Sequence, residues 1–181
     1  MKSTQRRARL TAFLIASTLA SSVANDARAE TENPRRTRVT LDIDYALALG
    51  EGDTDKGAGG TLRLGHELDL ATVALTPEVG LAYHGFDGSR SPSIYRAFIG
   101  ARSGFGGLLE PSLYARIGVA HANEDDGSRT VPSFGAGLAL DFTPIPMLDL
   151  GVHSGYELLF SGGDEDAFDW WVFGGHAGFV F

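Results

Sequence analysis

The sequence contains no cysteine, which excludes disulfides, a cysteine-linked lipid anchor and any thiolate metal site. Lysine is also scarce, since Lys56 is the only one beyond residue 29. No apolar run after residue 29 is long enough to span a bilayer as a helix. Packing and hydrogen bonding must therefore stabilise the fold, and a membrane location requires a closed barrel of strands.

The first residues have the layout of an export signal. Lys2 and three arginines precede an apolar run over residues 10–20, and Ala27-Arg28-Ala29 then offers a cleavage site before Glu30. We therefore expect residues 1–29 to be a signal peptide for the general secretory route, with cleavage after Ala24 as the alternative.

Removal of the signal leaves 152 residues, enough for one domain. The whole chain has a net charge of −8, and residues 1–29 carry five basic side chains and Asp26, so the mature chain carries −12. Such acidity disfavours nucleic acid as a partner.

Period-two alternation begins after a polar lead over residues 30–36 and continues almost to the end of the chain. It predicts eight strands, each with one apolar and one small or polar face. The segments are 39–49, 62–70, 78–84, 95–102, 113–119, 134–142, 148–157 and 171–181. The fold class is therefore all-β, an eight-stranded up-and-down antiparallel barrel over residues 37–181.

The composition of the two faces indicates which one points inward. The polar face is rich in glycine and has charges of both signs, which suits the cramped lumen of an eight-stranded barrel. A lipocalin-like barrel would expose a lysine-rich face to water, and this chain has no such face. We predict a lumenal charge network of Asp42, Asp44, Arg63, Glu67, Asp69, Glu78, Arg96, Arg102, Arg116, Asp141, Asp149 and Glu157.

The links between the predicted strands alternate in character. Those at 50–59, 85–92, 122–131 and 161–168 are polar and mostly acidic, whereas those at 71–76, 103–109 and 143–146 are less polar. Transmembrane barrels have long outer loops and short periplasmic turns in this order. Aromatic residues near the strand ends fit interfacial girdles.

The last segment ends on Phe181 and carries Trp171, Phe173 and Phe179 on the same face. With the alternation and the loop asymmetry, this resembles the small bacterial outer-membrane β-barrel proteins, such as the OmpA membrane domain and the OmpX type. The resemblance implies that these four aromatics form a C-terminal assembly signal, read by periplasmic chaperones and the barrel-assembly machinery. It also implies a location in the bacterial outer membrane, against lipid and lipopolysaccharide.

Two interpretations of the lumenal charges remain open. Buried charges must be paired, so a salt-bridge plug is favoured over a narrow path for ions or small solutes. His84, His153 and His176 are interpreted as lumenal polar fillers, and His66 and His121 as outward-facing residues near the headgroups.

The acidic clusters Glu51/Asp53/Asp55, Glu124/Asp125/Asp126 and Asp164/Glu165/Asp166 lie in the predicted outer loops. We interpret them as solvated loop tips, with divalent-cation binding as the alternative.

A lipid-modifying enzyme would need a nucleophile and a base on one face. His153 and Ser154 are adjacent in a strand and point to opposite faces. We predict no catalytic residue, cofactor or metal ligand. The expected function is a structural or surface-interaction role, with a channel and a lipid-modifying enzyme as alternatives.

Overall fold

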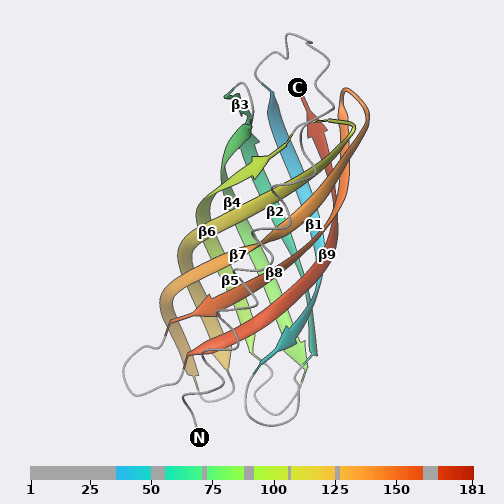
Figure 1. The fold of residues 1–181 in the computed structure, drawn as a ribbon. Helices are drawn as coiled ribbons and strands as arrows, with labels where there is room; N and C mark the ends of the chain where they lie inside the picture. The colour runs from blue at the N-terminus through green and yellow to red at the C-terminus, as the bar shows by residue number, and fades with distance from the viewer. Residues whose placement is uncertain are drawn as a thin grey trace, which may run out of the picture. The chain divides into compact units, whose positions relative to one another are not determined.

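Antiparallel strands make up almost all of the described chain (Figure 1). The computed structural model describes residues 36–49, 56–70, 73–87, 92–105, 107–124, 127–160 and 167–181. The strands are β1 (Thr37–Ala48), β2 (Lys56–His66), β3 (Leu68–Asp69), β4 (Ala74–Asp87), β5 (Ser93–Gly104), β6 (Leu109–Glu124), β7 (Gly127–Ile145), β8 (Leu148–Leu159) and β9 (Phe168–Val180). In this part of the chain, no helix is long and apolar enough to cross a membrane.

The sheet closes on itself. Sequential strands pair antiparallel, β1 pairs with both β2 and β9, and β2 pairs with β4. The short β3 follows β2 after Glu67 and pairs with the start of β4, so the nine strands form an eight-stranded barrel. The seam extends to the chain's last residue, because Thr37 and Phe181 exchange backbone hydrogen bonds of 2.8 and 2.9 Å. The predicted eight-stranded antiparallel barrel is confirmed.

The registers determine how strongly the strands are staggered. A path of directly paired residues leaves β1 at Arg38 and returns to β1 at Ala48, ten residues further along. The path runs through Gly65, Glu78, Gly100, Arg116, Gly135, Glu157 and Trp170. A shear of ten over eight strands corresponds to a tilt of about 40°. The interior of such a barrel is just wide enough to be filled by side chains.

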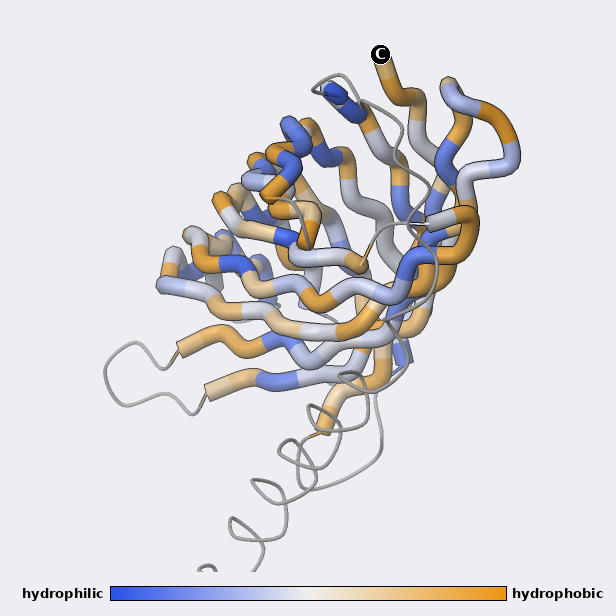
Figure 2. Tube along the Cα trace, turned by 45° about the horizontal axis from the view of Figure 1, so that its top comes forward, coloured by the Kyte–Doolittle hydropathy of each residue, from blue (hydrophilic) through white to orange (hydrophobic). Residues whose placement is uncertain are grey.

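Each strand separates its residues between two environments. In β1, Thr40, Asp42 and Asp44 are buried, whereas Leu41 and Ile43 are 56% and 72% exposed. The same alternation of polar and apolar residues follows the strands in Figure 2. The large apolar side chains therefore cover the outside, which is the arrangement of a barrel that faces lipid.

The strands are longer than the sequence indicated, so several predicted links are partly wrong. Lys56 to Gly59 were assigned to a loop but belong to β2, and the predicted link over 122–131 shrinks because β6 reaches Glu124 and β7 begins at Gly127. The glycines explain the first error. A Cβ at Gly57 would lie 2.8 Å from the ring of Phe86, so glycine here provides room for a neighbouring strand's side chain.

The two ends of the barrel differ. Thr37 and Phe181 lie together at one end, called the terminal end, and both strands of the seam reach it (Figure 1). Strands β1, β4, β6 and β8 end at the opposite end, called the loop end, and each of them precedes one of four links. These four links are the ones that the sequence assigned to the outer side.

Candidate functional site

The lumen is the candidate site, because the chain's charged side chains meet there. Ten of the twelve residues proposed for the charge network are buried: Asp42, Asp44, Arg63, Glu78, Arg96, Arg102, Arg116, Asp141, Asp149 and Glu157. Glu67 is partly exposed at the terminal end, and Asp69 is exposed. Asp69 keeps the expected face, because it is paired with the buried Ala74 in the register that β2 has with β4, but it lies beyond the start of β1 and is therefore exposed.

The central part of the network alternates positive and negative charges. Arg63 donates to both oxygens of Asp42 at 2.7 and 2.8 Å and to Glu78 at 3.1 Å. Glu78 in turn accepts from Nε of Arg116 at 2.7 Å. These four side chains come from β1, β2, β4 and β6, so the contacts connect different parts of the wall. Charge-assisted hydrogen bonds of this kind offset the cost of burying the ions.

A second group of ion pairs links strands across the lumen. Arg102 lies 2.8 and 2.9 Å from the two oxygens of Asp141, which also accepts from Ser112 at 3.0 Å. Arg96 pairs with Glu157. The strands that carry Arg102 and Asp141, β5 and β7, are not neighbours in the sheet. These contacts therefore brace the barrel from inside.

Two aromatic rings pack among the arginines. The Arg116 guanidinium lies 4.3 Å from the Tyr114 ring centre and 4.8 Å from that of Phe98. Cation–π contacts are strongest where water is excluded, and all three side chains are buried. A Cβ at Gly155 would overlap the Tyr114 hydroxyl, so this glycine provides the space for the ring.

Three histidines complete the polar interior. His153 and Asp44 form a 2.7 Å hydrogen bond through Nε2 and Oδ1, and His84 Nε2 lies 3.3 Å from the other oxygen of Asp44. His176 Nε2 lies 2.7 Å from Asp141 Oδ1, though without hydrogen-bond alignment. The rings of His153 and His176 stack with centres 5.8 Å apart. The structure thus brings together histidines that the sequence placed in the lumen without connecting them.

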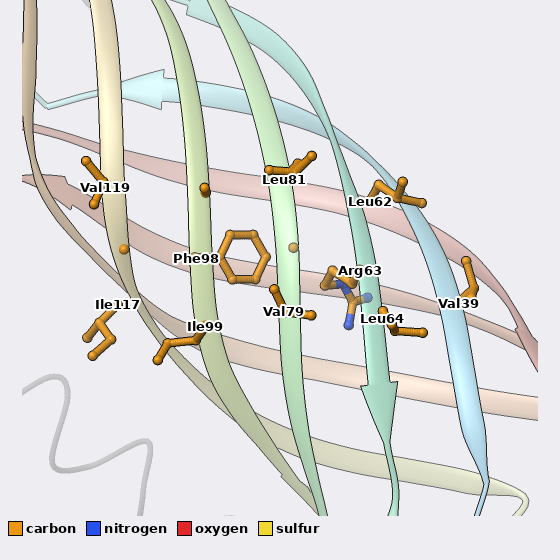
Figure 3. A pocket seen from close by; sticks show the side chains of 13 residues that line it. Val39, Leu62, Arg63, Leu64, Val79, Leu81, Phe98, Ile99, Ile117 and Val119 are labelled. Carbon is orange, nitrogen blue, oxygen red and sulfur yellow. The ribbon is translucent and has the colours of Figure 1, made fainter.

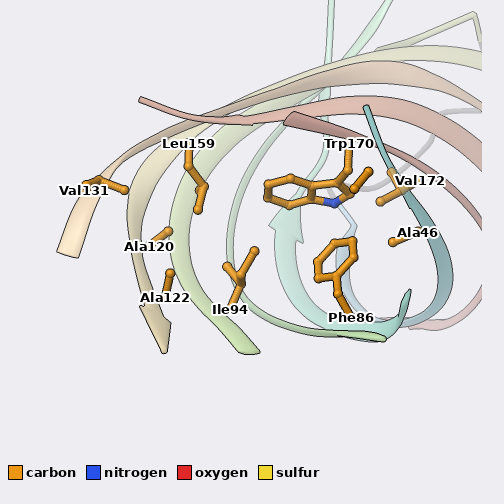
Figure 4. Close-up of a cluster of buried hydrophobic side chains, with 10 residues drawn as sticks. Ala46, Phe86, Ile94, Ala120, Ala122, Val131, Leu159, Trp170 and Val172 are labelled. Atoms are coloured by element: carbon orange, nitrogen blue, oxygen red, sulfur yellow. The ribbon is translucent and has the colours of Figure 1, made fainter. Parts of the chain in front are cut away.

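An apolar cluster fills the lumen at the loop end (Figure 4). Trp170 lies at its centre with no exposed surface, and the Phe86 and Phe168 rings lie 5.8 and 5.5 Å from it. The remaining members are Ala46, Ala48, Ile94, Ala120, Ala122, Val131, Leu159 and Val172. This cluster was not predicted from the sequence, because the alternation indicated a polar character for the entire inward face. The position of Trp170 in the strand was the available signal, because residues separated by an even number of positions share a face and Trp170 therefore lies on the same face as Val172 and His176.

The outer surface is apolar and locally hollowed (Figure 3). Small residues at Gly80, Ala97 and Gly118 form the floor of a hollow of ≈ 630 Å³, and leucine, isoleucine and valine side chains surround it. The four aromatics of the proposed assembly signal also face outward, with exposures of 40% for Trp171, 47% for Phe173, 67% for Phe179 and 71% for Phe181.

The outward histidines make local contacts. His66 lies 3.1 Å from Thr37, and His121 lies 3.0 Å from Thr130, in both cases through Nδ1 and a hydroxyl. Ser112 and Ser133 are buried in the lumen, and His153 and Ser154 point to opposite faces as expected.

The structure adds lumenal residues that the sequence analysis missed. Arg38 pairs with Glu67 and Asp149, each at 2.9 Å, and Glu110 is paired in the sheet with the lumenal Asp141. Both were missed because the predicted strands began at residues 39 and 113, after Arg38 and Glu110. Each of the two residues nevertheless lies on the inward face that the alternation in its strand indicates.

Other expectations lie largely beyond the described residues. The signal peptide 1–29, Glu51/Asp53/Asp55, Asp164/Glu165/Asp166 and the pair Asp125 and Asp126 fall in the undescribed ranges. Glu124 is described and pairs with Arg129 at 3.3 Å.

Eight antiparallel strands with a shear of ten, an apolar exterior and a charged lumen define the fold of a small outer-membrane β-barrel. Among solved structures, the chain is similar to Neisserial surface protein A, with 17% identity, a TM-score of 0.66, and coverage of 80% of this chain and 97% of that one. It is also similar to Ail, the attachment invasion locus protein of Yersinia pestis, with 20% identity, a TM-score of 0.51, and coverage of 81% and 99%.

A third similar structure is the outer membrane enzyme PagL, with 16% identity, a TM-score of 0.59, and coverage of 75% of this chain and 97% of that one. No protein-family model matches the sequence, and the curated proteins contain no match. These likenesses support the fold, which occurs in surface proteins and in an enzyme alike.

Proposed function

We propose that this protein is exported to the bacterial outer membrane and forms a closed, non-conducting barrel with a structural or surface-contact role. The observation that carries the proposal is the filled lumen. Ion pairs occupy its middle, and the apolar cluster around Trp170 occupies the loop end. Water needs polar partners to stay in a narrow space, and an apolar constriction tends to exclude it.

The ion pairs also oppose conduction. A permeating ion would have to separate partners such as Arg63 and Asp42 or Arg102 and Asp141, which lie within 3 Å of each other and are almost fully buried. Breaking a buried pair without replacing a partner costs about 3–5 kcal/mol. The stable wall then presents the outer links to the cell's surroundings, which suits surface contact.

Single-channel recording in planar bilayers tests the closed lumen. The purified wild-type barrel should give no stable conductance steps. The double variant Phe86→Ala/Trp170→Ala, which empties the loop end, serves as the comparison for an opened barrel. Stable, ohmic steps from the wild-type protein would contradict the proposal and favour the channel alternative.

Two further measurements address location and chemistry. N-terminal sequencing of the protein from fractionated outer membranes should give Glu30 as the first residue, and recovery in soluble periplasm would contradict the location. Mass spectrometry of lipid A from expressing cells should show no mass shift. Among the described residues, the outward histidines contact threonine hydroxyls, and neither forms an ion pair with a carboxylate that could orient it as a base. A shift that requires His121 would instead support the enzyme alternative.

A further inference from the structure

Three side chains on consecutive strands converge inside the barrel next to its seam. Asp42 lies on β1, His176 on β9 and His153 on β8. Asp42 and His176 are directly paired across the seam, and one possible ligand atom from each of the three residues lies within 4.8 Å of the others. All three side chains are more than nine-tenths buried.

Both imidazoles carry a nitrogen without a partner. Among the described residues, the Nδ1 atoms of His153 and His176 are buried and accept or donate no hydrogen bond. A buried polar atom left unpaired costs free energy, so it indicates a missing partner. Two histidines that each have such a nitrogen, stacked next to a carboxylate, have the composition of a transition-metal site.

The opposite nitrogens provide the supporting contacts that metal-binding histidines use. Nε2 of His153 is hydrogen-bonded to Asp44 at 2.7 Å, whereas Nε2 of His176 lies 2.7 Å from Asp141 without hydrogen-bond alignment and would need a small rotation of the ring to form the bond. A carboxylate on one ring nitrogen favours the tautomer whose other nitrogen has a free lone pair, and it raises the basicity of that nitrogen. Asp42 is oriented by Arg63, and its oxygens keep further lone pairs for a ligand.

Glycines on the partner strands hold both rings in place. A Cβ at Gly174 would lie 2.7 Å from Cε1 of His153, and one at Gly151 would lie 2.5 Å from Cε1 of His176. Any other residue at these positions would displace a ring. Gly175, by contrast, faces outward, and a Cβ there would meet its nearest neighbour at 3.6 Å.

The charge balance also favours a cation. On the terminal side of the apolar cluster, the described lumenal side chains include five arginines and eight carboxylates: Asp42, Asp44, Glu67, Glu78, Glu110, Asp141, Asp149 and Glu157. The excess of acid lies partly at the terminal end, where Arg38 pairs with Glu67 and Asp149, and Glu110 is paired in the sheet with Asp141. The terminal end is therefore acidic, while the Trp170 cluster closes the other end.

We propose that the lumen binds one divalent transition-metal ion, with Zn²⁺ as the best match, through Asp42, His153 and His176. Two imidazole nitrogens select such ions over Ca²⁺ and Mg²⁺, which prefer oxygen ligands. Zinc bonds are about 2.0–2.2 Å long, so the side chains must close in by about an ångström. The bound ion joins β8, β9 and β1, and thereby fastens the seam between the first and last strands.

A neighbouring triad provides the sharpest control. Asp141, Asp149 and His176 also place ligand atoms within 4.8 Å of one another. This triad offers a single nitrogen, however, whereas the first offers two. The proposal therefore requires His153 and does not require Asp149.

The test uses the untagged exported chain, purified in detergent, stripped with a chelator and titrated with Zn²⁺ by calorimetry. We expect one ion per barrel, at least tenfold weaker binding in His153→Gln and His176→Gln, and unchanged binding in Asp149→Asn. His84→Gln is the matched control, because His84 is equally buried and contacts Asp44 but lies outside the triad. Equal losses in His84→Gln and His153→Gln, or loss in Asp149→Asn alone, would overturn the ligand assignment.

The wild-type protein gives an answer even if a variant fails to fold. X-ray absorption of the Zn²⁺-loaded barrel should show two imidazoles in the first shell, and Zn²⁺ should raise the temperature at which the barrel loses its heat-modifiable gel mobility. Gly151→Ala should weaken binding, while Gly175→Ala should leave it unchanged. No saturable Zn²⁺ binding by the wild-type barrel, or a first shell without imidazole, would refute the proposal.

Discussion

Replacing Ile117 with arginine should destabilise the folded barrel strongly in lipid. Ile117 is 58% exposed, lies at the middle of β6, and forms part of the wall of the outer hollow (Figure 3). In the membrane, an arginine there must reach water from the midplane, at a cost of about 2–4 kcal/mol. A cost of about 3 kcal/mol lowers the folding equilibrium constant by about 150-fold.

The matched control is Met147→Arg. Met147 is 63% exposed, about as much as Ile117, but it lies in the turn between β7 and β8 at the terminal end. Near the interface the same substitution should cost about 0–1 kcal/mol. The two variants therefore differ in membrane depth and hardly in exposure.

Urea titration of both variants in phospholipid vesicles measures the difference, with folded barrel quantified by its heat-modifiable gel mobility. If the apolar face were in contact with water instead of lipid, Ile117→Arg would leave the free energy of unfolding unchanged or raise it, because an isoleucine exposed to water contributes no buried apolar area to folding. Equal midpoints for Ile117→Arg and Met147→Arg would thus refute the assignment of the outer face.

Two single substitutions, one double variant and one deletion test the interior and the end of the chain. Glu157→Leu leaves Arg96 buried without its partner and should cost about 3–5 kcal/mol in a urea titration, whereas Arg96→Met/Glu157→Leu should recover most of that loss. Trp170→Ala removes the centre of the apolar cluster and should cost about 3–5 kcal/mol by the same assay. Deletion of Phe181 should abolish assembly in cells but permit refolding in detergent, and normal assembly in cells would contradict an assembly signal.

The alternation made the fold predictable. In a strand, a shift of one residue moves every side chain to the other face, so the apolar positions of β1 determine its orientation without further information. Ile43 is 72% exposed and its neighbour Asp42 is 1% exposed, as their parity required. The number of strands followed from the same pattern, because each segment kept one apolar face.

The strand ends were less predictable, because glycine has two uses. Gly57 and Gly59 suggested a loop, but their space is filled by Phe86 and His84 from β4. The sequence does not show which strand will lie beside a glycine. It therefore cannot separate a glycine that turns the chain from one that makes room for a neighbour.

The contacts inside the lumen depend on the shear, which the sequence does not reveal. Parity placed Arg102 and Asp141 on the inward face, but their 2.8 Å contact requires strands β5 and β7 to meet at a particular height. The same holds for His153 and His176, whose rings stack because Gly174 and Gly151 lie directly opposite them. The inward residues were thus predictable one by one, and their partners were not.

The absence of native cysteine permits a direct measurement of the central claim, that this barrel stands in lipid with its apolar face outward. Single cysteines at Leu113, Ala115, Ile117 and Val119 can be labelled with a nitroxide, and the accessibility of each label to oxygen and to a water-soluble nickel complex can be compared in vesicles. The account predicts high oxygen accessibility with a maximum near Ile117, and exclusion of the nickel complex there. Free access of the nickel complex to all four positions would contradict it.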